Sequence, residues 1–337
     1  MAGMGELRTD PVDGKAILFA LARRNRPHDF SLARPPRSHG NPASCPFCPG
    51  NEFRNAVVLD GVPAPGGGWR TRVVPNRFPI VEPDPEAPIH APSPYTAAPR
   101  RGWHEVIVET PLHRGDLPDL DPSAMAAVIE TYRRRHRALA AMPEVASVLL
   151  FRNHGPAAGA SLAHPHAQIA ALPYLPHATR RRRELAVAHF QRFGRCLLQD
   201  VAAAEIADGR RMLHRDNGFV AFVPFAAEVP GEIWILPVVP RAAFGQIDDG
   251  EVVRLAAVLQ TCLTQLRLAF QDPDYNLVIC DSPVGDPADG AQCWHLRIHP
   301  RTARYGGYEI GWGERINPSL PELDAAALRG AKGAVRG

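Results

Sequence analysis

Two histidines and a glutamine alternate within one short stretch, His164 to Gln168, and these residue types in this spacing are the best suited to chemistry. In an extended strand, residues two apart point to the same face and lie roughly 6.6 Å apart. An imidazole that is held through one ring nitrogen can attack phosphorus with the other, and a carboxamide can hold a phosphoryl oxygen without protonating a leaving group. The stretch therefore indicates transfer of a nucleotidyl group through a covalent histidine intermediate.

The elements around this stretch follow from turn and capping signals. The glycine-containing segment Asn153 to Ser161 precedes it and predicts a turn. Asp121 followed by Pro122 predicts a helix start, because aspartate caps helices and proline fits the first helical position. That helix is expected to run to about residue 141. Strands are expected over residues 103–109, 145–151 and 164–170.

The second half of the chain repeats this order of elements. Its strands are expected over 231–237, 275–280 and 293–299, with a helix over roughly 250–269. The counterparts lie about 130 residues apart, which favours an internal duplication over two unrelated units. We predict an α+β fold with two antiparallel-sheet halves and flanking helices, residues 1–190 and 191–337.

Only one half is expected to be catalytic. Arg297 stands at the position in the second half that corresponds to His166 in the first. Arginine stays protonated and cannot attack phosphorus. We therefore expect one active site for each pair of halves.

Composition limits the class of protein. The chain has 337 residues, of which 45% are hydrophobic and 22% charged, with a net charge of +3; this suits a folded protein and gives no sign of a nucleic-acid partner. No apolar run approaches the roughly 18 residues of a membrane helix, and the N-terminus lacks a signal-peptide pattern. Of six cysteines only Cys45 and Cys48 form a close pair, which is not a disulfide framework. We expect a cytoplasmic protein without a membrane or nucleic-acid partner.

Several segments together resemble the galactose-1-phosphate uridylyltransferase family of the histidine-triad superfamily. They are Cys45 to Glu52, His104 to His113, Asn153 to Gly155 and the histidine stretch, within a likeness that covers nearly the whole chain. The C-terminal part is similar to the plant ADP-glucose phosphorylase branch of that family. The resemblance implies a duplicated histidine-triad fold and ping-pong kinetics.

The resemblance also implies roles for particular residues. His166 is expected to attack the α-phosphorus of a nucleoside diphosphate sugar, releasing a sugar 1-phosphate. Gln168 stands where hydrolytic relatives have a third histidine, and a carboxamide cannot shuttle protons, so the intermediate should resist water. The other implied substrate contacts are Arg23 and Arg26 for phosphates, Asn76, Phe78, Phe151 and Asn153 for the nucleoside, Gly159 and Ser161 for the phosphate cradle, and Tyr308 and Glu309 for the hexose. Solvated arginines, a simple turn and a salt bridge at Glu309 are the ordinary alternatives.

A structural zinc site is a further expectation. Cys45 and Cys48 have zinc-knuckle spacing, and the resemblance supplies His113 and His164 as the other ligands. Such a closed tetrahedral set suits Zn²⁺ and leaves no position for chemistry. A pair of free or reactive thiols is the alternative.

A second metal site found in parts of the family is expected to be absent. Cys196 is followed by Gln199 where plant-type enzymes have a second cysteine, and Pro240 and Cys293 fall where histidine ligands would be. Proline cannot coordinate a metal through its side chain.

The leading function implied is transfer of UMP from UDP-glucose to a hexose 1-phosphate, galactose 1-phosphate. The alternative with the same chemistry is an ADP-glucose phosphorylase, which moves AMP to inorganic phosphate. The segment Gly311 to Arg315 departs from the glutamine-bearing uridylyltransferase pattern and leaves the acceptor open. A non-catalytic nucleotide-binding regulator is opposed by the presence of His166, and a histidine-triad hydrolase by Gln168. The candidate assembly is a homodimer.

Overall fold

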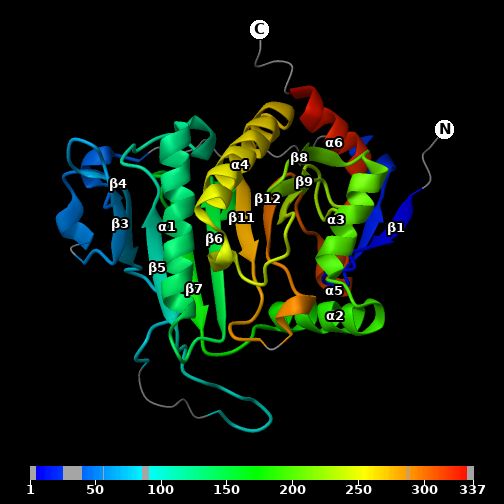
Figure 1. Ribbon diagram of the computed structural model, residues 1–337, viewed down its shortest axis with the longest axis horizontal. Coiled ribbons are helices and arrows are strands. Elements are labelled where there is room, and N and C mark those ends of the chain that lie inside the picture. The colour runs from blue at the N-terminus through cyan, green and yellow to red at the C-terminus, as the bar shows by residue number, and fades with distance from the viewer. Residues whose placement is uncertain (1–4, 26–39, 56, 86–90, 287, 332–337) are drawn as a thin grey trace.

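Ten strands form one continuous antiparallel sheet in the computed structural model, which describes residues 5–25, 40–55, 57–85, 91–286 and 288–331. The first half contributes β3 (Asp60–Pro63), β4 (Trp69–Pro75), β5 (Trp103–Val108), β6 (Ser147–His154) and β7 (His166–Leu172). The second half contributes β8 (Met212–Arg215), β9 (Phe219–Phe222), β10 (Ile233–Pro237), β11 (Tyr275–Cys280) and β12 (His295–Pro300). Their order across the sheet is β3-β4-β5-β7-β6-β11-β12-β10-β9-β8 (Figure 1).

The strand order confirms the predicted duplication. Helix α1 (Pro122–Ala140) lies between β5 and β6 in the chain, and α4 (Asp249–Ala269) lies between β10 and β11 at the equivalent place. Each half therefore consists of three strands, a long helix and two strands. The halves meet where β6 pairs with β11, with Asn153 opposite Asn276.

The two long helices lie side by side across one face of the sheet (Figure 1). Asp121 caps α1 as predicted, since its carboxylate accepts hydrogen bonds from the backbone N–H groups of Ser123 and Ala124. On β7, Ala167, Ile169 and Ala171 are fully buried in the core beneath these helices. The alternating residues therefore face the opposite side of the sheet, where the candidate site lies.

Helix α4 bears on the expectation that no apolar run is long enough to form a membrane helix. By length and composition alone it could cross a membrane. Half of its most apolar stretch is buried within the protein, and Leu255 and Leu259 lie in the core shared with α1. A helix that packs against the core needs an apolar face, which accounts for this composition.

The two histidine-containing strands begin later than the sequence predicted. The strand β7 starts at His166 instead of His164, because Pro165 has no N–H to give to the ladder. Only its carbonyl pairs, accepting from the N–H of Glu109 at 3.2 Å. His164 is thereby left outside the ladder, next to the end of β5.

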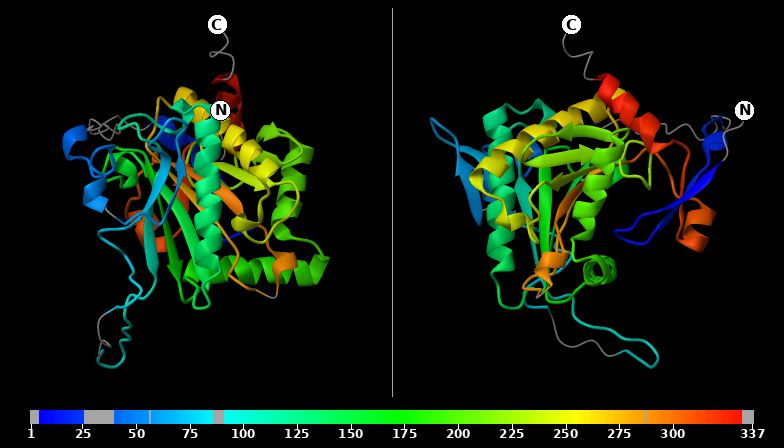
Figure 2. Two further views of the ribbon diagram at one scale, coloured as in Figure 1. Left: turned by 60° about the vertical axis from the view of Figure 1, so that its left-hand side comes forward. Right: turned by 45° about the vertical axis from the view of Figure 1, so that its right-hand side comes forward.

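The remaining elements surround the large sheet. Helices α2 (His177–Phe193) and α3 (Leu197–Asp208) connect the halves. A small sheet of β1 (Glu6–Thr9), β2 (Ala16–Phe19) and β13 (Arg315–Asn317) lies to one side together with α5 (Gly307–Trp312), and α6 (Pro321–Gly330) follows (Figure 2). Short 3₁₀ helices are η1 (Leu21–Asn25), η3 (Pro42–Ser44), η4 (Glu52–Asn55), η5 (Leu117–Asp119), η6 (Pro156–Ala158), η7 (Phe244–Gln246) and η8 (Asp289–Ala291).

Candidate active site

His166 is the first residue of β7, and its ring is fixed by the backbone. Its Nδ1 lies 2.8 Å from the carbonyl oxygen of His164. A carbonyl only accepts hydrogen bonds, so Nδ1 carries the proton and Nε2 keeps its lone pair. The residue is buried, and burial lowers the pKa of the ring below its ordinary value. The arrangement supplies a neutral imidazole with one reactive nitrogen.

A cavity of about 550 Å³ opens beside this ring. A volume of this size falls within the usual range for small-molecule sites. Its walls come from the Cys45 loop, the segment after β5, the end of β6 and the segment that leads into β7. The second half also contributes, through Arg267 and Asp272.

The loop after β6 is held by the second half. A Cβ at Gly155, whose φ is +83°, would overlap the Asp274 carboxylate, so only glycine fits there. Asp274 accepts a hydrogen bond from the backbone N–H of Ala157 at 2.7 Å. Asn276 donates through Nδ2 to the Ala158 carbonyl at 2.9 Å and to Asn153 Oδ1 at 2.8 Å.

These contacts shape the segment that was predicted as a phosphate cradle. Gly159 has a left-handed conformation at the end of η6, and Ser161 is exposed and lines the cavity. The Asn153 oxygen is occupied by Asn276, so its amino group is the free end of that carboxamide for a ligand. The loop is therefore preformed by β11 and presents the Asn153 amino group as a donor.

Gln168 lies two residues beyond His166 on the same face of β7. Its Oε1 accepts hydrogen bonds from His104 Nε2 at 2.9 Å and from Asn76 Nδ2 at 3.2 Å. Gln168, Asn76, Phe78 and Phe151 do not line the cavity itself. They form a continuation of the same face, with Phe78 exposed and Phe151 directly opposite Gln168 on β6.

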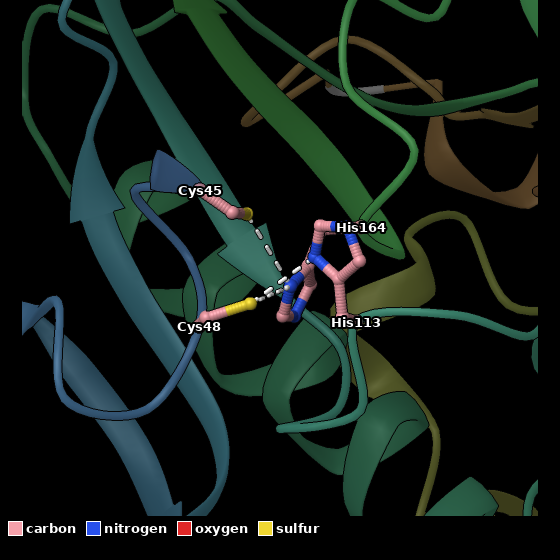
Figure 3. Close-up of side chains that lie close together, drawn as sticks. All are labelled: Cys45, Cys48, His113 and His164. Atoms are coloured by element: carbon pink, nitrogen blue, oxygen red, sulfur yellow. Dashed lines mark hydrogen bonds between the residues drawn. The ribbon is translucent and has the colours of Figure 1, made fainter. Parts of the chain in front are cut away.

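Cys45, Cys48, His113 and His164 come together as the sequence predicted (Figure 3). Their four candidate ligand atoms all lie within 4.8 Å of one another. His164 Nε2 lies 2.8 Å from the Thr110 carbonyl, so it carries the proton and Nδ1 faces both sulfur atoms at 3.6 Å. A metal-binding histidine is commonly held in this way through its other nitrogen.

The electrostatics of these four residues suit a metal ion. Burial lowers the pKa of His164 to about 4, which keeps the ring neutral. Burial and the neighbouring Cys45 raise the pKa of the Cys48 thiol to about 11. A divalent cation would reverse the thiol shift, because a coordinated thiol is deprotonated. Two thiolates and two imidazoles could hold a metal such as zinc in a closed tetrahedral site.

A buried charge network beneath the cavity was missed by sequence reasoning. Arg152 donates from Nε to Glu109 at 2.9 Å and pairs through Nη2 with Asp116 at 2.9 Å. Tyr275 donates to Asp116 at 2.9 Å, and Tyr132 donates to Glu109. Burial raises the pKa of Glu109, with Arg152 acting against it. Nothing in the local sequence marks these residues, because they converge from the segment after β5 and from α1, β6 and β11.

Other predicted contacts lie away from this cavity. Arg23 is exposed on η1 and does not line it, and Arg26 lies outside the described residues. Tyr308 and Glu309 lie on α5, beside the small sheet and away from β5 and β7 (Figures 1 and 2). Tyr308 donates to Glu314 at 2.9 Å, and Glu309 accepts from the backbone N–H of Gly306 at 2.8 Å. Within one chain, these residues do not meet His166.

An apolar cluster occupies the position at which the resemblance implied a second metal site in other members. Cys196 and Cys293 lie in one buried apolar cluster with Val12 and Leu198. Burial raises the pKa of both thiols, that of Cys293 to about 12. Gln199 donates to the Pro237 carbonyl at 3.2 Å.

Comparisons with known proteins agree with this geometry. The family model for galactose-1-phosphate uridyl transferase, N-terminal domain, matches residues 3–176. ADP-glucose phosphorylase of Arabidopsis thaliana is 34% identical over 330 residues, covering 96% of this chain and 92% of the relative. Galactose-1-phosphate uridylyltransferase of Thermotoga maritima is 26% identical over 345 residues, covering 97% and 98%.

Solved structures lead to the same family. The crystal structure of Arabidopsis thaliana ADP-glucose phosphorylase with bound ADP-glucose superimposes with a TM-score of 0.82 at 31% identity, covering 97% of this chain and 98% of that one. A uridylyltransferase structure gives a TM-score of 0.78 at 28% identity, covering 99% and 100%. The chain therefore belongs to the galactose-1-phosphate uridylyltransferase family of nucleotidyltransferases.

Proposed function

We propose that this chain transfers AMP from ADP-glucose to inorganic phosphate through a covalent intermediate on His166. The observation that carries the chemistry is the ring of His166, held at Nδ1 by the His164 carbonyl and adjoining a cavity of about 550 Å³. The choice of nucleotide and acceptor follows the 34% identity to a plant ADP-glucose phosphorylase. This identity supports the AMP reaction over the UMP reaction, which was the leading expectation from the sequence.

The first step needs no acid catalyst. Nε2 of His166 donates its lone pair to the α-phosphorus, the P–N bond forms, and the bond to the glucose 1-phosphate oxygen breaks. The leaving group departs as a phosphate that is already ionised at neutral pH, so no proton is required. The proton on Nδ1 stays with the ring and continues to donate to the His164 carbonyl.

The second step reverses the bond changes with a different nucleophile. An oxygen of inorganic phosphate attacks the phosphorus, the P–N bond breaks, and ADP leaves with the neutral ring restored. Gln168 supports both steps by donating a hydrogen bond from Nε2 to a phosphoryl oxygen, where charge develops in the transition state. Because a carboxamide cannot take a proton from water, the intermediate persists until phosphate arrives.

Transfer of UMP from UDP-glucose to galactose 1-phosphate is the second candidate. The similarity to the Thermotoga maritima uridylyltransferase favours it. The residues that face the nucleoside in either case are Asn76, Phe78 and Phe151. Incubation with each nucleotide sugar in turn separates the two candidates.

Incubation with a nucleotide sugar and no acceptor tests the function directly. We expect the protein to gain the mass of one adenylyl group with ADP-glucose and no comparable adduct with UDP-glucose. His166→Ala should form no adduct, whereas His189→Ala, a half-buried histidine on α2, should behave as wild type. Intact-protein mass spectrometry makes the measurement. A uridylyl adduct alone would establish the second candidate, and an adduct on His166→Ala would exclude His166 as the nucleophile.

Gln168→His tests the resistance to water. A histidine at this position can carry protons to and from water, so the isolated adduct should hydrolyse at least about tenfold faster. The measurement is the decay of the adduct in buffer without phosphate, followed by mass. Gln168→Asn, which keeps an amide, is the control and should not accelerate hydrolysis. An unchanged lifetime in Gln168→His contradicts the assigned role.

We propose that Cys45, Cys48, His113 and His164 hold a structural zinc ion. It would tie the loop before η4 to the residue whose carbonyl orients His166, and every coordination position would be filled by protein. Its contribution is therefore to folding and position, with no step of the reaction passing through it.

Cys45→Ser tests the zinc site. We expect about one zinc per wild-type chain, less than about a tenth of that in the variant, and a lower melting temperature, because metal binding contributes to folding free energy. Elemental analysis and thermal unfolding provide the measurements. Cys196→Ser, also at a buried cysteine, should retain its zinc. A zinc-free wild type whose melting temperature is unchanged by Cys45→Ser rules the site out.

We also propose that a second copy of the chain brings Tyr308 and Glu309 to the His166 cavity. Neither residue lines that cavity within one chain. Their helix α5 also exposes two large apolar side chains, Ile310 at 78% and Trp312 at 76%, which is typical of a contact surface.

Complementation tests this assembly. His166→Ala and Glu309→Ala should each lose activity alone. When the two variants are co-expressed, about half of all dimers contain one copy of each, and such a hybrid has one intact site of two. Activity should therefore return to about a quarter of the wild-type value at most. Native mass spectrometry gives the assembly state. Full activity in a monomer, or no recovery in verified hybrids, contradicts a shared site.

A further inference from the structure

A set of hydrogen bonds beside β7 decides which end of the Gln168 side chain is available. It starts at His104 on β5, whose Nδ1 accepts the backbone N–H of Ile80 at 3.0 Å. Since that nitrogen accepts, it carries no proton, and in the neutral ring the proton resides on Nε2. Burial lowers the pKa of His104, which favours this neutral form.

His104 therefore donates to Gln168. Its Nε2 lies 2.9 Å from Gln168 Oε1, so the atom it contacts has to be the carbonyl oxygen. Asn76 Nδ2 donates to the same oxygen at 3.2 Å. The Asn76 carboxamide is itself oriented, because its Oδ1 accepts the backbone N–H of Phe78 at 2.9 Å.

The two converging donors leave one orientation for the Gln168 amide. A flipped amide would place its N–H groups against two other donors and lose both hydrogen bonds. In the observed orientation, no residue in the described part of the chain accepts a hydrogen bond from Gln168 Nε2. The amino group is thus the end held ready for a ligand.

The backbone N–H groups of Phe78 and Ile80, which orient Asn76 and His104, belong to one segment between β4 and β5, Asn76 to Ile80. This segment contains Asn76 and the exposed Phe78, the residues proposed to face the nucleoside. The segment is connected to Gln168 by two chains of hydrogen bonds. One runs from the Ile80 N–H through His104, and the other runs from the Phe78 N–H through Asn76. A nucleoside that contacts this segment would therefore contact the residues that orient the Gln168 amide.

We propose that His104 is a positioning residue that presents the Gln168 amino group to the phosphoryl group of the substrate. The proposal rests on the proposed function, in which Gln168 donates to a phosphoryl oxygen. Without His104, the amide samples the flipped orientation, which directs a carbonyl oxygen at the phosphoryl oxygens and removes a donor from the transition state. Removing one such donor costs about 10²–10³ in rate. Because Asn76 remains, we expect a loss of roughly 10- to 100-fold.

Replacement of His104 tests the proposal through the rate of adduct formation with ADP-glucose. His104→Phe keeps a planar ring without a donor, and it should slow adduct formation roughly 10- to 100-fold with KM within about threefold. His104→Gln restores an N–H donor and should recover most of the rate. His189→Phe is the matched control, and thermal unfolding confirms that each variant is folded.

A double-mutant cycle separates positioning from general structural damage. In a Gln168→Leu background the amide is absent, so His104→Phe should have no further effect on the rate. Full additivity of the two losses, or a His104→Phe variant as fast as wild type, overturns the proposal. If His104→Phe does not fold, His104→Leu replaces it in both backgrounds. A His104→Gln variant that forms the adduct no faster than the apolar variants also overturns the proposal. A wild-type chain that forms no adduct with either nucleotide sugar instead overturns the proposed function.

Discussion

The hydrogen bond from His166 Nδ1 to the His164 carbonyl is the interaction on which the candidate site depends. It leaves Nε2 as the reactive nitrogen and fixes the plane of the ring. The carbonyl is in turn fixed by its own residue, because the His164 ring is anchored between Thr110 and the two cysteine sulfurs. His164 therefore joins the cluster of Cys45, Cys48 and His113 to His166, through its side chain on one side and its backbone on the other.

The second half of the duplication keeps the fold of the first half and helps to hold the candidate site in place. At the position equivalent to His166, Arg297 is held by Glu232 at 3.0 Å and Glu228 at 3.4 Å, and it stacks over Trp234 at 4.6 Å. A buried arginine with carboxylate partners is costly to disturb and chemically inert. The edge strand of this half serves the other: Asn276 on β11 shapes the loop after β6.

Preorganised carboxamides are a common feature of the site. Asn153 is oriented by Asn276, and Gln168 by His104 and Asn76. In both cases the oxygen is occupied by protein donors, and the amino group is the end left for a ligand. A phosphoryl group carries negative charge on its oxygens, so fixed N–H donors stabilise it without reorganising during the reaction.

Much of the local structure could be predicted from the sequence, because its causes are local. The cap at Asp121, the alternation along β7 and the close cysteine pair depend on neighbours a few residues away. The duplication was also predictable, since repeated element order leaves a spacing that the chain displays. The start of β7 was missed by two residues, although the reason, a proline without an N–H, is itself local.

The sequence by itself determined which side chains were available for chemistry: an imidazole beside a carboxamide, near two cysteines and two histidines that could hold a metal ion. Only the tertiary structure decided how these groups are held. The Arg152 network gathers side chains from the segment after β5 and from α1, β6 and β11, and Gln168 is oriented by residues 64 and 92 positions away. It also decided that α5 lies away from the His166 cavity within one chain. Such contacts depend on which strands become neighbours, and sheet order is set by burial of the whole core, which no short stretch of sequence encodes.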